Sequence, residues 1–182
     1  CLNNSGSCSA DLTPQERMRV ANELVENNIL DIIISGGEPL LIPDIFNLLE
    51  KLKSSQAQIS LLTNGLLLNN ETCKQLSPLV DFLQVSLDSL RPEVQEKLTT
   101  VQGSHAAIMR GIECALSHKL PLMIGAVINK LNFNEMGDLA EFCIEKRVVN
   151  LSISEMMPIG RARKNFEELS IGDEERIKAF HQ

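Results

Sequence analysis

Short apolar runs alternate along the chain with segments whose apolar residues recur at intervals of three or four. The runs predict β-strands, and the segments between them predict amphipathic helices. Because the strands are apolar throughout rather than alternating, they favour a parallel sheet covered by helices. Five strands are predicted, over residues 31–34, 59–63, 82–87, 122–128 and 148–153.

Several helix starts carry capping signals. Thr13, Pro14 and Glu16 form a capping box with proline in the first turn, which predicts that a helix begins there. Ser104 and Asn134 are each predicted to cap the helix that follows them. Further helices are predicted from Pro43-Asp44, over about residues 70–76, and from Asp173.

The alternation of strand and helix continues without a linker or a break in composition. The 182 residues suit one domain with a sizeable core, so we expect a single domain over residues 1–182. Either an open doubly wound sheet or a barrel satisfies the pattern. In both folds ligands bind where the strands end, so the strand ends are the first place to search for a site.

Glycines and polar residues gather at these strand ends. Glu38, next to a glycine pair, can hold an ammonium group, and Ser86 and Asp88 can hydrogen-bond ribose hydroxyls. A local turn is the competing interpretation of Ser86, Asp88 and Asn129, and a solvated basic patch is that of Arg161. The candidate binding residues are Gly36, Gly37, Glu38, Pro39, Asn64, Ser86, Asp88, Asn129, Met156 and Arg161.

Composition narrows the class of protein. The net charge of -7 and the absence of Tyr and Trp argue against a nucleic-acid partner, which needs basic and stacking side chains. No apolar run is long enough to span a bilayer, so no membrane association is expected. Five cysteines at irregular spacing indicate a reducing, cytoplasmic setting rather than a disulfide scaffold. Cys114 and Cys143 are expected to be buried, and Cys73 partly exposed.

The strand-end motifs, taken in order, resemble those of the radical S-adenosylmethionine (SAM) family. Gly36-Gly37-Glu38-Pro39 resembles the family's GGEP motif, which implies binding of the methionine amino group of SAM. Thr63-Asn64-Gly65 resembles its TNG segment, and Ser86-Leu87-Asp88-Ser89 its ribose contact. Asn129 matches a polar SAM contact, and the main chain around Met156 is expected against the adenine. Residues 158–162, Pro-Ile-Gly-Arg-Ala, resemble a segment common in members with an extra C-terminal SPASM or twitch domain.

The family's cluster motif, C-x3-C-x2-C, is not present as such. The resemblance makes Cys1 its third cysteine and one ligand of a [4Fe–4S] cluster, whose irons thiolates bind well. Two cysteines and a first strand would then lie upstream. The fold implied is a partial (βα)6 TIM-like barrel of parallel strands that lacks the first strand and most of the cluster loop. On its own, this chain is expected to be inactive.

The resemblance implies an enzyme in which SAM and the cluster generate a 5′-deoxyadenosyl radical that abstracts hydrogen from a substrate. The substrate implied is a peptide, a protein or a cofactor precursor, and the reductant is a protein such as flavodoxin or ferredoxin. No catalytic side chain is assigned. A non-catalytic barrel that binds SAM or a peptide is one alternative. A phosphate-binding barrel is another, although residues 156–161 lack its glycine-rich loop.

Overall fold

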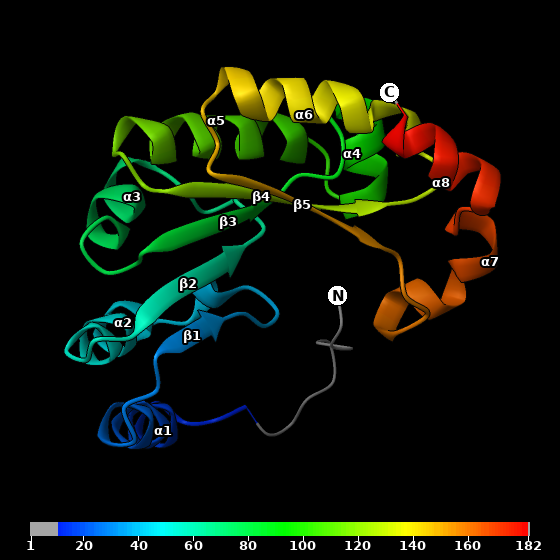
Figure 1. Ribbon diagram of the computed structural model, residues 1–182. Helices are drawn as coiled ribbons and strands as arrows, with labels where there is room; N and C mark the ends of the chain where they lie inside the picture. The colour runs from blue at the N-terminus through cyan, green and yellow to red at the C-terminus, as the bar shows by residue number, and fades with distance from the viewer. Residues whose placement is uncertain (1–10, 182) are drawn as a thin grey trace.

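The structure, a computed structural model, describes residues 11–181. Five parallel strands form one sheet in the order β1-β2-β3-β4-β5, so each crossover adds the next strand at the same edge. The sheet curls into part of a barrel (Figure 1). The strands are β1 (Asp31–Ile34), β2 (Gln58–Thr63), β3 (Phe82–Ser86), β4 (Leu122–Ile128) and β5 (Asn150–Glu155).

Helices connect the strands, because parallel neighbours need a long crossover connection. Further helices precede and follow the sheet. The α-helices are α1 (Pro14–Glu26), α2 (Ile45–Lys53), α3 (Asn70–Leu76), α4 (Pro92–Thr99), α5 (Ser104–Ser117), α6 (Met136–Glu145), α7 (Phe166–Leu169) and α8 (Asp173–Phe180). Three 3-10 helices lie in the loops: η1 (Pro39–Leu41), η2 (Phe133–Glu135) and η3 (Gly160–Lys164).

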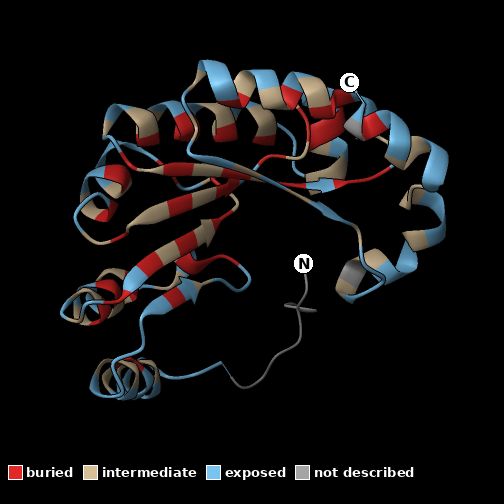
Figure 2. Cartoon of the chain, viewed as in Figure 1, coloured by how far each residue is buried: buried red, intermediate tan, exposed pale blue. Residues whose placement is uncertain are grey.

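The two faces of the sheet differ in character. On the convex face, alternate strand residues are buried beneath the helices, as the red segments of Figure 2 show. Ile59, Leu61, Leu83, Val85 and Ile124 are all fully buried there and form the centre of the core. Burial of apolar side chains on this face supplies the main favourable term in folding.

The concave face is open and mixed in character, because it exposes Ile33 and Val127 and carries small and polar residues across β3, β4 and β5. Strand register places Ser86 beside Gly125, and Gly125 beside Ser152. Ser86 and Ser152 are exposed. Gln84 lies across the glycine, because a Cβ on Gly125 would stand only 2.5 Å from Gln84 Nε2. A filled barrel would carry large branched residues at such positions, so this face has room for a ligand.

Most elements agree with the pattern of the sequence. All five strands are present, with β5 displaced by two residues towards the C-terminus. Thr13 Oγ1 accepts a hydrogen bond from the Glu16 N–H at 3.2 Å, and the Glu16 carboxylate accepts one from the Thr13 N–H at 2.8 Å, so the capping box is confirmed. The partial barrel of parallel strands is confirmed as well.

Four details of the expected pattern are wrong. Cys114 is only partly buried, although it was expected to be buried. Asn134 does not cap a helix, because η2 intervenes and α6 begins at Met136. Ser104 is the first residue of α5 rather than its cap, and its hydroxyl lies 2.7 Å from Thr99 Oγ1 instead. Cys73 is completely buried, since α3 packs its inner face against α5.

Candidate active site

The predicted residues gather at one edge of the sheet, where its strands end. Gly36 and Gly37 are exposed in the loop after β1, and Pro39 opens η1. Asn64 follows β2, and Met156 follows β5. Arg161 lies within η3, farther along the chain. Cys1 lies outside the described residues.

Glu38 ties the end of β1 to the end of β2. Its Oε1 accepts hydrogen bonds from Thr63 Oγ1 at 2.7 Å and from the Leu40 N–H at 3.2 Å. Its Oε2 accepts one from the Asn64 N–H at 2.7 Å. The residue is 9% exposed. A carboxylate has about four acceptor positions, so three bonds leave it capacity for one donor from a ligand.

The Thr63-Asn64-Gly65 turn is shaped by its own side chains. Thr63 Oγ1 accepts a hydrogen bond from the Gly65 N–H at 3.1 Å, and Asn64 Oδ1 accepts one from the Leu66 N–H at 2.9 Å. Gly65 has a φ of 80°, and a Cβ there would stand 2.9 Å from Val85 Cγ1. Both the left-handed backbone and the lack of space require glycine at this position.

Asp88 joins the ends of β3 and β4. Its Oδ1 accepts a hydrogen bond from the Val127 N–H at 2.7 Å. Burial raises the pKa of the Asp88 carboxyl, although the bond from Val127 opposes this shift. Ser86, two residues earlier, is exposed on the concave face. The pair therefore presents a hydroxyl and a carboxyl at the same strand end.

Asn129 is engaged with nearby main chain. Its Nδ2 donates to the Val127 carbonyl at 3.0 Å, and its Oδ1 accepts from the Leu131 N–H at 2.9 Å. The residue is 3% exposed. These bonds are those of a local turn, which was the competing interpretation of this position.

Four polar residues that the strand-end argument did not single out lie behind Asp88. Gln95 on α4 and Asn132 before η2 both bond to the Asp88 main chain. Ser89 Oγ donates to Glu135 Oε2 at 2.6 Å, and Glu135 forms an ion pair with Arg91 at 2.6 Å. The available signal was Arg91-Pro92, because proline in a first turn marks a helix start and hence predicts α4. The buried polar residues of this network are Ser89, Gln95, Asn132 and Glu135.

The end of β5 borders a small cavity of about 80 Å³. Met156 lines it, together with Glu155 and Arg176. Arg176 Nε and Nη2 donate to the two carboxylate oxygens of Glu155 at 2.6 and 3.0 Å, which holds α8 against the strand end. The remaining lining residues are Ile128, Phe166, Ser170 and Ile171.

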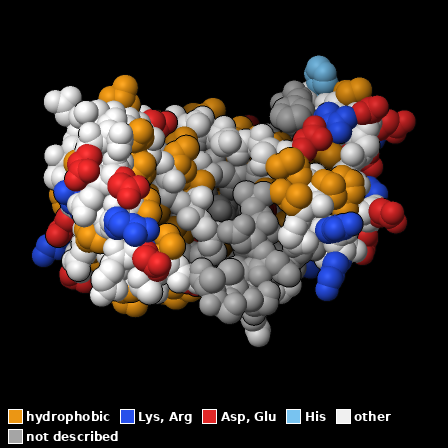
Figure 3. All heavy atoms as spheres, turned by 90° about the horizontal axis from the view of Figure 1, so that it is seen from below, with side chains coloured by type: hydrophobic (Ala, Val, Ile, Leu, Met, Phe, Trp, Pro, Cys, Tyr) orange, Lys and Arg blue, Asp and Glu red, His pale blue; other side chains and the backbone are white. Residues whose placement is uncertain are grey.

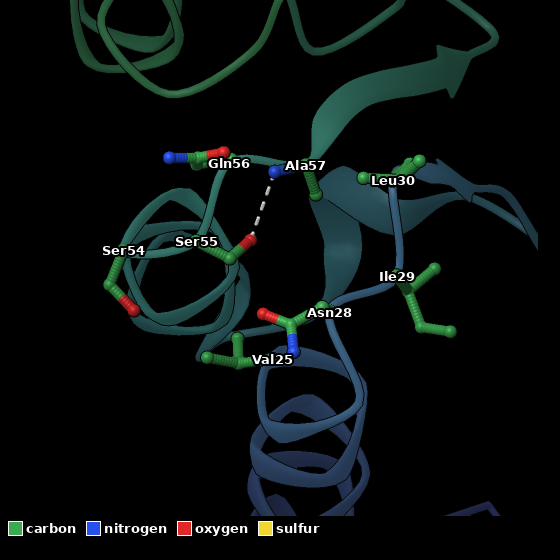
Figure 4. Close-up of a pocket in the computed structure, with 8 residues that line it drawn as sticks. All are labelled: Val25, Asn28, Ile29, Leu30, Ser54, Ser55, Gln56 and Ala57. Atoms are coloured by element: carbon green, nitrogen blue, oxygen red, sulfur yellow. Dashed lines mark hydrogen bonds between the residues drawn. The ribbon is translucent and has the colours of Figure 1, made fainter.

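A larger cavity, of about 360 Å³, lies at the opposite edge of the sheet (Figure 4). Leu30 and Ala57 line it, and each directly precedes a strand. In barrels of this type this edge serves stability, whereas the strand C-termini carry function. The other lining residues are Val25, Asn28, Ile29, Ser54, Ser55 and Gln56.

The residues at the strand ends fit SAM. They do not test whether the protein binds a metal cluster. Glu38, Asp88 and the serine-lined concave face offer acceptors for ammonium and hydroxyl groups. Within residues 11–181, no group of three His, Cys, Asp or Glu side chains could hold a metal ion. Burial raises the pKa of the Cys143 thiol to about 11, and burial beside Cys114 raises that of Cys73 to about 12. These thiols stay protonated at neutral pH and are poor metal ligands.

Comparison with known families gives a match over most of the chain. Residues 1–143 match the radical SAM superfamily. No helix in the described part of the chain is both long and apolar enough to cross a membrane.

The chain is also similar to curated proteins and to solved structures. Over 157 residues the chain is 33% identical to a protein named "Probable GTP 3',8-cyclase" from Methanocaldococcus jannaschii, covering 85% of this chain and 52% of that protein. It is 29% identical to an "AdoMet-dependent heme synthase" from Methanosarcina barkeri, covering 93% of this chain and 48% of that one. The fold resembles Streptococcus suis SuiB bound to S-adenosylmethionine, with a TM-score of 0.74, 21% identity, and coverage of 86% and 37%. The chain thus spans about half the length of the curated relatives it matches.

Proposed function

This chain belongs to the radical SAM superfamily, and we propose that the full-length protein is an enzyme that binds SAM and a [4Fe–4S] cluster. Together these cofactors supply a 5′-deoxyadenosyl radical for hydrogen abstraction when bound. The observation that carries the proposal is the family match over residues 1–143, which includes every strand-end motif up to Asn129. Membership in the superfamily supports SAM-dependent radical chemistry, and we propose the cofactor contacts of individual residues with it.

We assign the methionine end of SAM to the ends of β1 and β2. The Glu38 carboxylate, held by Thr63 and Asn64, keeps one acceptor position for the ammonium group. Gly36 is exposed, and a Cβ built on it would meet no atom within 4 Å, so a ligand can approach its main chain. Gly37 and Pro39 complete this segment. Prior fixing of these groups by the protein spares the ligand the entropic cost of ordering them.

The nucleoside end is assigned to the ends of β3, β4 and β5. Ser86 and Asp88 offer hydrogen-bonding groups to the ribose, and the main chain around Met156, directly after β5, is proposed to lie against the adenine. Asn129 shapes the turn after β4, and Arg161 is proposed to act near the SAM carboxylate or the substrate. Such a ligand would extend along the whole C-terminal edge of the curled sheet (Figure 1).

Cys1 is proposed as one thiolate ligand of the cluster. The assignment depends on the resemblance of the residues after Cys1 to the segment that follows the family's cluster motif. We place the protein in the cytoplasm, where a reductant protein such as flavodoxin or ferredoxin is available, and expect no nucleic-acid or membrane partner.

The proposed substrate is a peptide, a protein or a cofactor precursor. Two named relatives concern small molecules, GTP and heme, while the structure of a SuiB complex contains a precursor peptide. The concave face, with Gln84, Ser86 and Ser152, is where we expect the reacting part of the substrate to enter.

Reductive cleavage of SAM tests this proposal. The full-length protein, reconstituted anaerobically, is expected to convert SAM to 5′-deoxyadenosine and methionine when dithionite is added. Glu38→Gln should slow this conversion about tenfold or more. The substitution replaces one acceptor oxygen by an NH2 group, which would face the donor groups that the carboxylate now binds. Chromatography of the quenched reaction measures both products.

Glu71→Gln is the matched control, since Glu71 is exposed on α3 and bonds to Gln75 on the same helix. It should cleave SAM at the wild-type rate. Absence of 5′-deoxyadenosine from the wild-type reaction, with an intact cluster present, would refute the proposed activity.

A further inference from the structure

Two buried side-chain amides hold the main chain of Asp88 from opposite sides. Gln95 Oε1 accepts hydrogen bonds from the N–H groups of Asp88 at 2.9 Å and Ser89 at 3.0 Å. Asn132 Nδ2 donates to the carbonyl oxygen of Asp88 at 2.6 Å and to that of Val127 at 3.0 Å. Both polar groups of the Asp88 main chain are therefore bound by side chains rather than by a neighbouring strand.

The orientation of each amide follows from its partners. Gln95 must place its oxygen toward the two N–H donors, and Asn132 must place its NH2 group toward the two carbonyls. Asn132 Oδ1 in turn accepts a bond from the Asn129 N–H at 2.7 Å. Gln95 is 1% exposed and Asn132 is fully buried. Buried amides with no alternative partner hold the groups they bond to in one arrangement.

A second set of contacts anchors the loop that carries Ser89. The Ser89 hydroxyl donates to Glu135 Oε2, and Arg91 Nε donates to Glu135 Oε1 at 2.9 Å. Arg91 Nη2 also donates to the Leu131 carbonyl at 3.0 Å. The loop between Asp88 and α4 is thus joined to the segment before α6.

This arrangement leaves one oxygen of Asp88 for a ligand. Oδ1 is bound by the Val127 N–H, and Oδ2 has no hydrogen-bond partner within the described range 11–181. With its N–H, its carbonyl and one carboxylate oxygen all held, Asp88 has little freedom to turn away. The position of Oδ2 is then set before any ligand arrives.

We propose that Gln95 and Asn132 are positioning residues for the nucleoside part of SAM, acting through Asp88. This inference rests on the proposed function, because it takes the ribose hydroxyls as the ligand of Asp88. The two amides hold Asp88 in its binding position, so that SAM does not bear the cost of ordering the loop. Neither residue touches SAM itself.

Binding of SAM to the reconstituted full-length protein tests the proposal, with dissociation constants measured by isothermal titration calorimetry. Gln95→Leu removes the acceptor and should weaken SAM binding about tenfold, the equivalent of one hydrogen bond. Asn132→Asp turns an oxygen toward two carbonyls and should weaken binding at least as much as Gln95→Leu.

Gln75→Leu is the matched control. Within residues 11–181 the Gln75 side chain bonds to Glu71 on the surface of α3, away from the strand ends, so its loss should leave SAM binding unchanged. If Gln95→Leu fails to fold, Asn132→Asp serves in its place, and thermal unfolding of each variant reports loss of stability separately from loss of affinity.

A double-mutant cycle with Asp88→Ala separates positioning from general loosening of the loop. If Gln95 acts through Asp88, Gln95→Leu should cost no further affinity once the carboxylate is gone. Wild-type affinity in Gln95→Leu, or a full additional loss in the Asp88→Ala background, would overturn the inference. Failure of the proposed function is distinguishable, because the wild-type protein would then not bind SAM at all.

Discussion

The carboxylates at the strand ends differ in how many hydrogen bonds they accept from the protein. Glu38 accepts three hydrogen bonds from protein groups and stabilises the junction of β1 and β2. Asp88 accepts one hydrogen bond, from the Val127 N–H, and burial raises the pKa of its carboxyl. Glu38 therefore stabilises the strand junction and keeps one acceptor position for a ligand, whereas the whole of Asp88 Oδ2 is free of partners within residues 11–181.

The raised pKa of Asp88 predicts how SAM binding depends on pH. Protonation removes the negative charge of the carboxylate and makes it a weaker acceptor, so affinity should fall with acid, with a midpoint above the ordinary aspartate value of 3.8. Asp88→Asn keeps Oδ1 for Val127 but should bind SAM more weakly and without this pH dependence. Calorimetric titration of both proteins across the acid range measures the difference, and a midpoint at or below 3.8 would contradict the assignment.

The same shift has a consequence for stability. A carboxyl with a raised folded-state pKa binds its proton more tightly when folded, so stability falls as pH rises from 3.8 through the folded-state pKa. The ionised carboxylate therefore costs folding free energy at neutral pH. Urea unfolding at pH 7 should show Asp88→Asn to be as stable as the wild type or slightly more so, and a large loss of stability would argue against this cost.

Elements pack closely where the site is formed. Helix α5 meets the turn after β2 at Gly111, where a Cβ would stand 2.8 Å from the Gly65 carbonyl oxygen and 2.9 Å from Leu68 Cβ. This contact lets the helix support the Thr63-Asn64-Gly65 turn directly. The position of that turn, and hence of the groups that bind Glu38, depends on the close approach of the helix.

Gly111→Ala should therefore destabilise the protein, although replacing glycine by alanine inside a helix usually stabilises it. Alanine in a helix interior ordinarily stabilises by about 0.5–1 kcal/mol relative to glycine. Here the clash with main chain should destabilise the protein by roughly 1–3 kcal/mol. Urea unfolding measures the change, with Arg110→Ala on the exposed face of α5 as the control. A stabilised Gly111→Ala would show that the helix can move away from the turn.

Apolar periodicity predicts these elements well and their polar supports poorly. The strands β1 to β4 and helix α3 fall within a residue of the predicted bounds, because their apolar runs end at turn residues such as Asn64 and Gly65. Helix α4 was missed, since its eight residues bury only Val94 and Gln95. Asn134 was chosen as a cap by residue type, yet the neighbouring Asn132 makes the buried bonds.

At the scale of the whole molecule, the parallel order of five strands brings the predicted residues to one edge. This much could be predicted, because parallel strands share the direction in which they end. The network behind Asp88 could not, since it joins residues 44 to 46 positions apart through loops that strand periodicity does not place.

The distribution of charged side chains separates the flanks of the molecule from the concave face of the sheet. In the view from below (Figure 3), charged side chains gather on the two flanks, and the parts of the middle not covered by grey atoms show uncharged groups. This agrees with the serines and Gln84 on the concave face of the sheet. A surface of uncharged polar and apolar groups suits a SAM molecule and the uncharged parts of a substrate.

The electron paramagnetic resonance spectrum of the reduced, anaerobically reconstituted full-length protein tests the central claim most directly. A [4Fe–4S] signal that changes when SAM is added, and that is lost in Cys1→Ala, is the predicted result. Failure to assemble a cluster, under conditions in which another member of the superfamily does so, would contradict the assignment of radical chemistry to this protein.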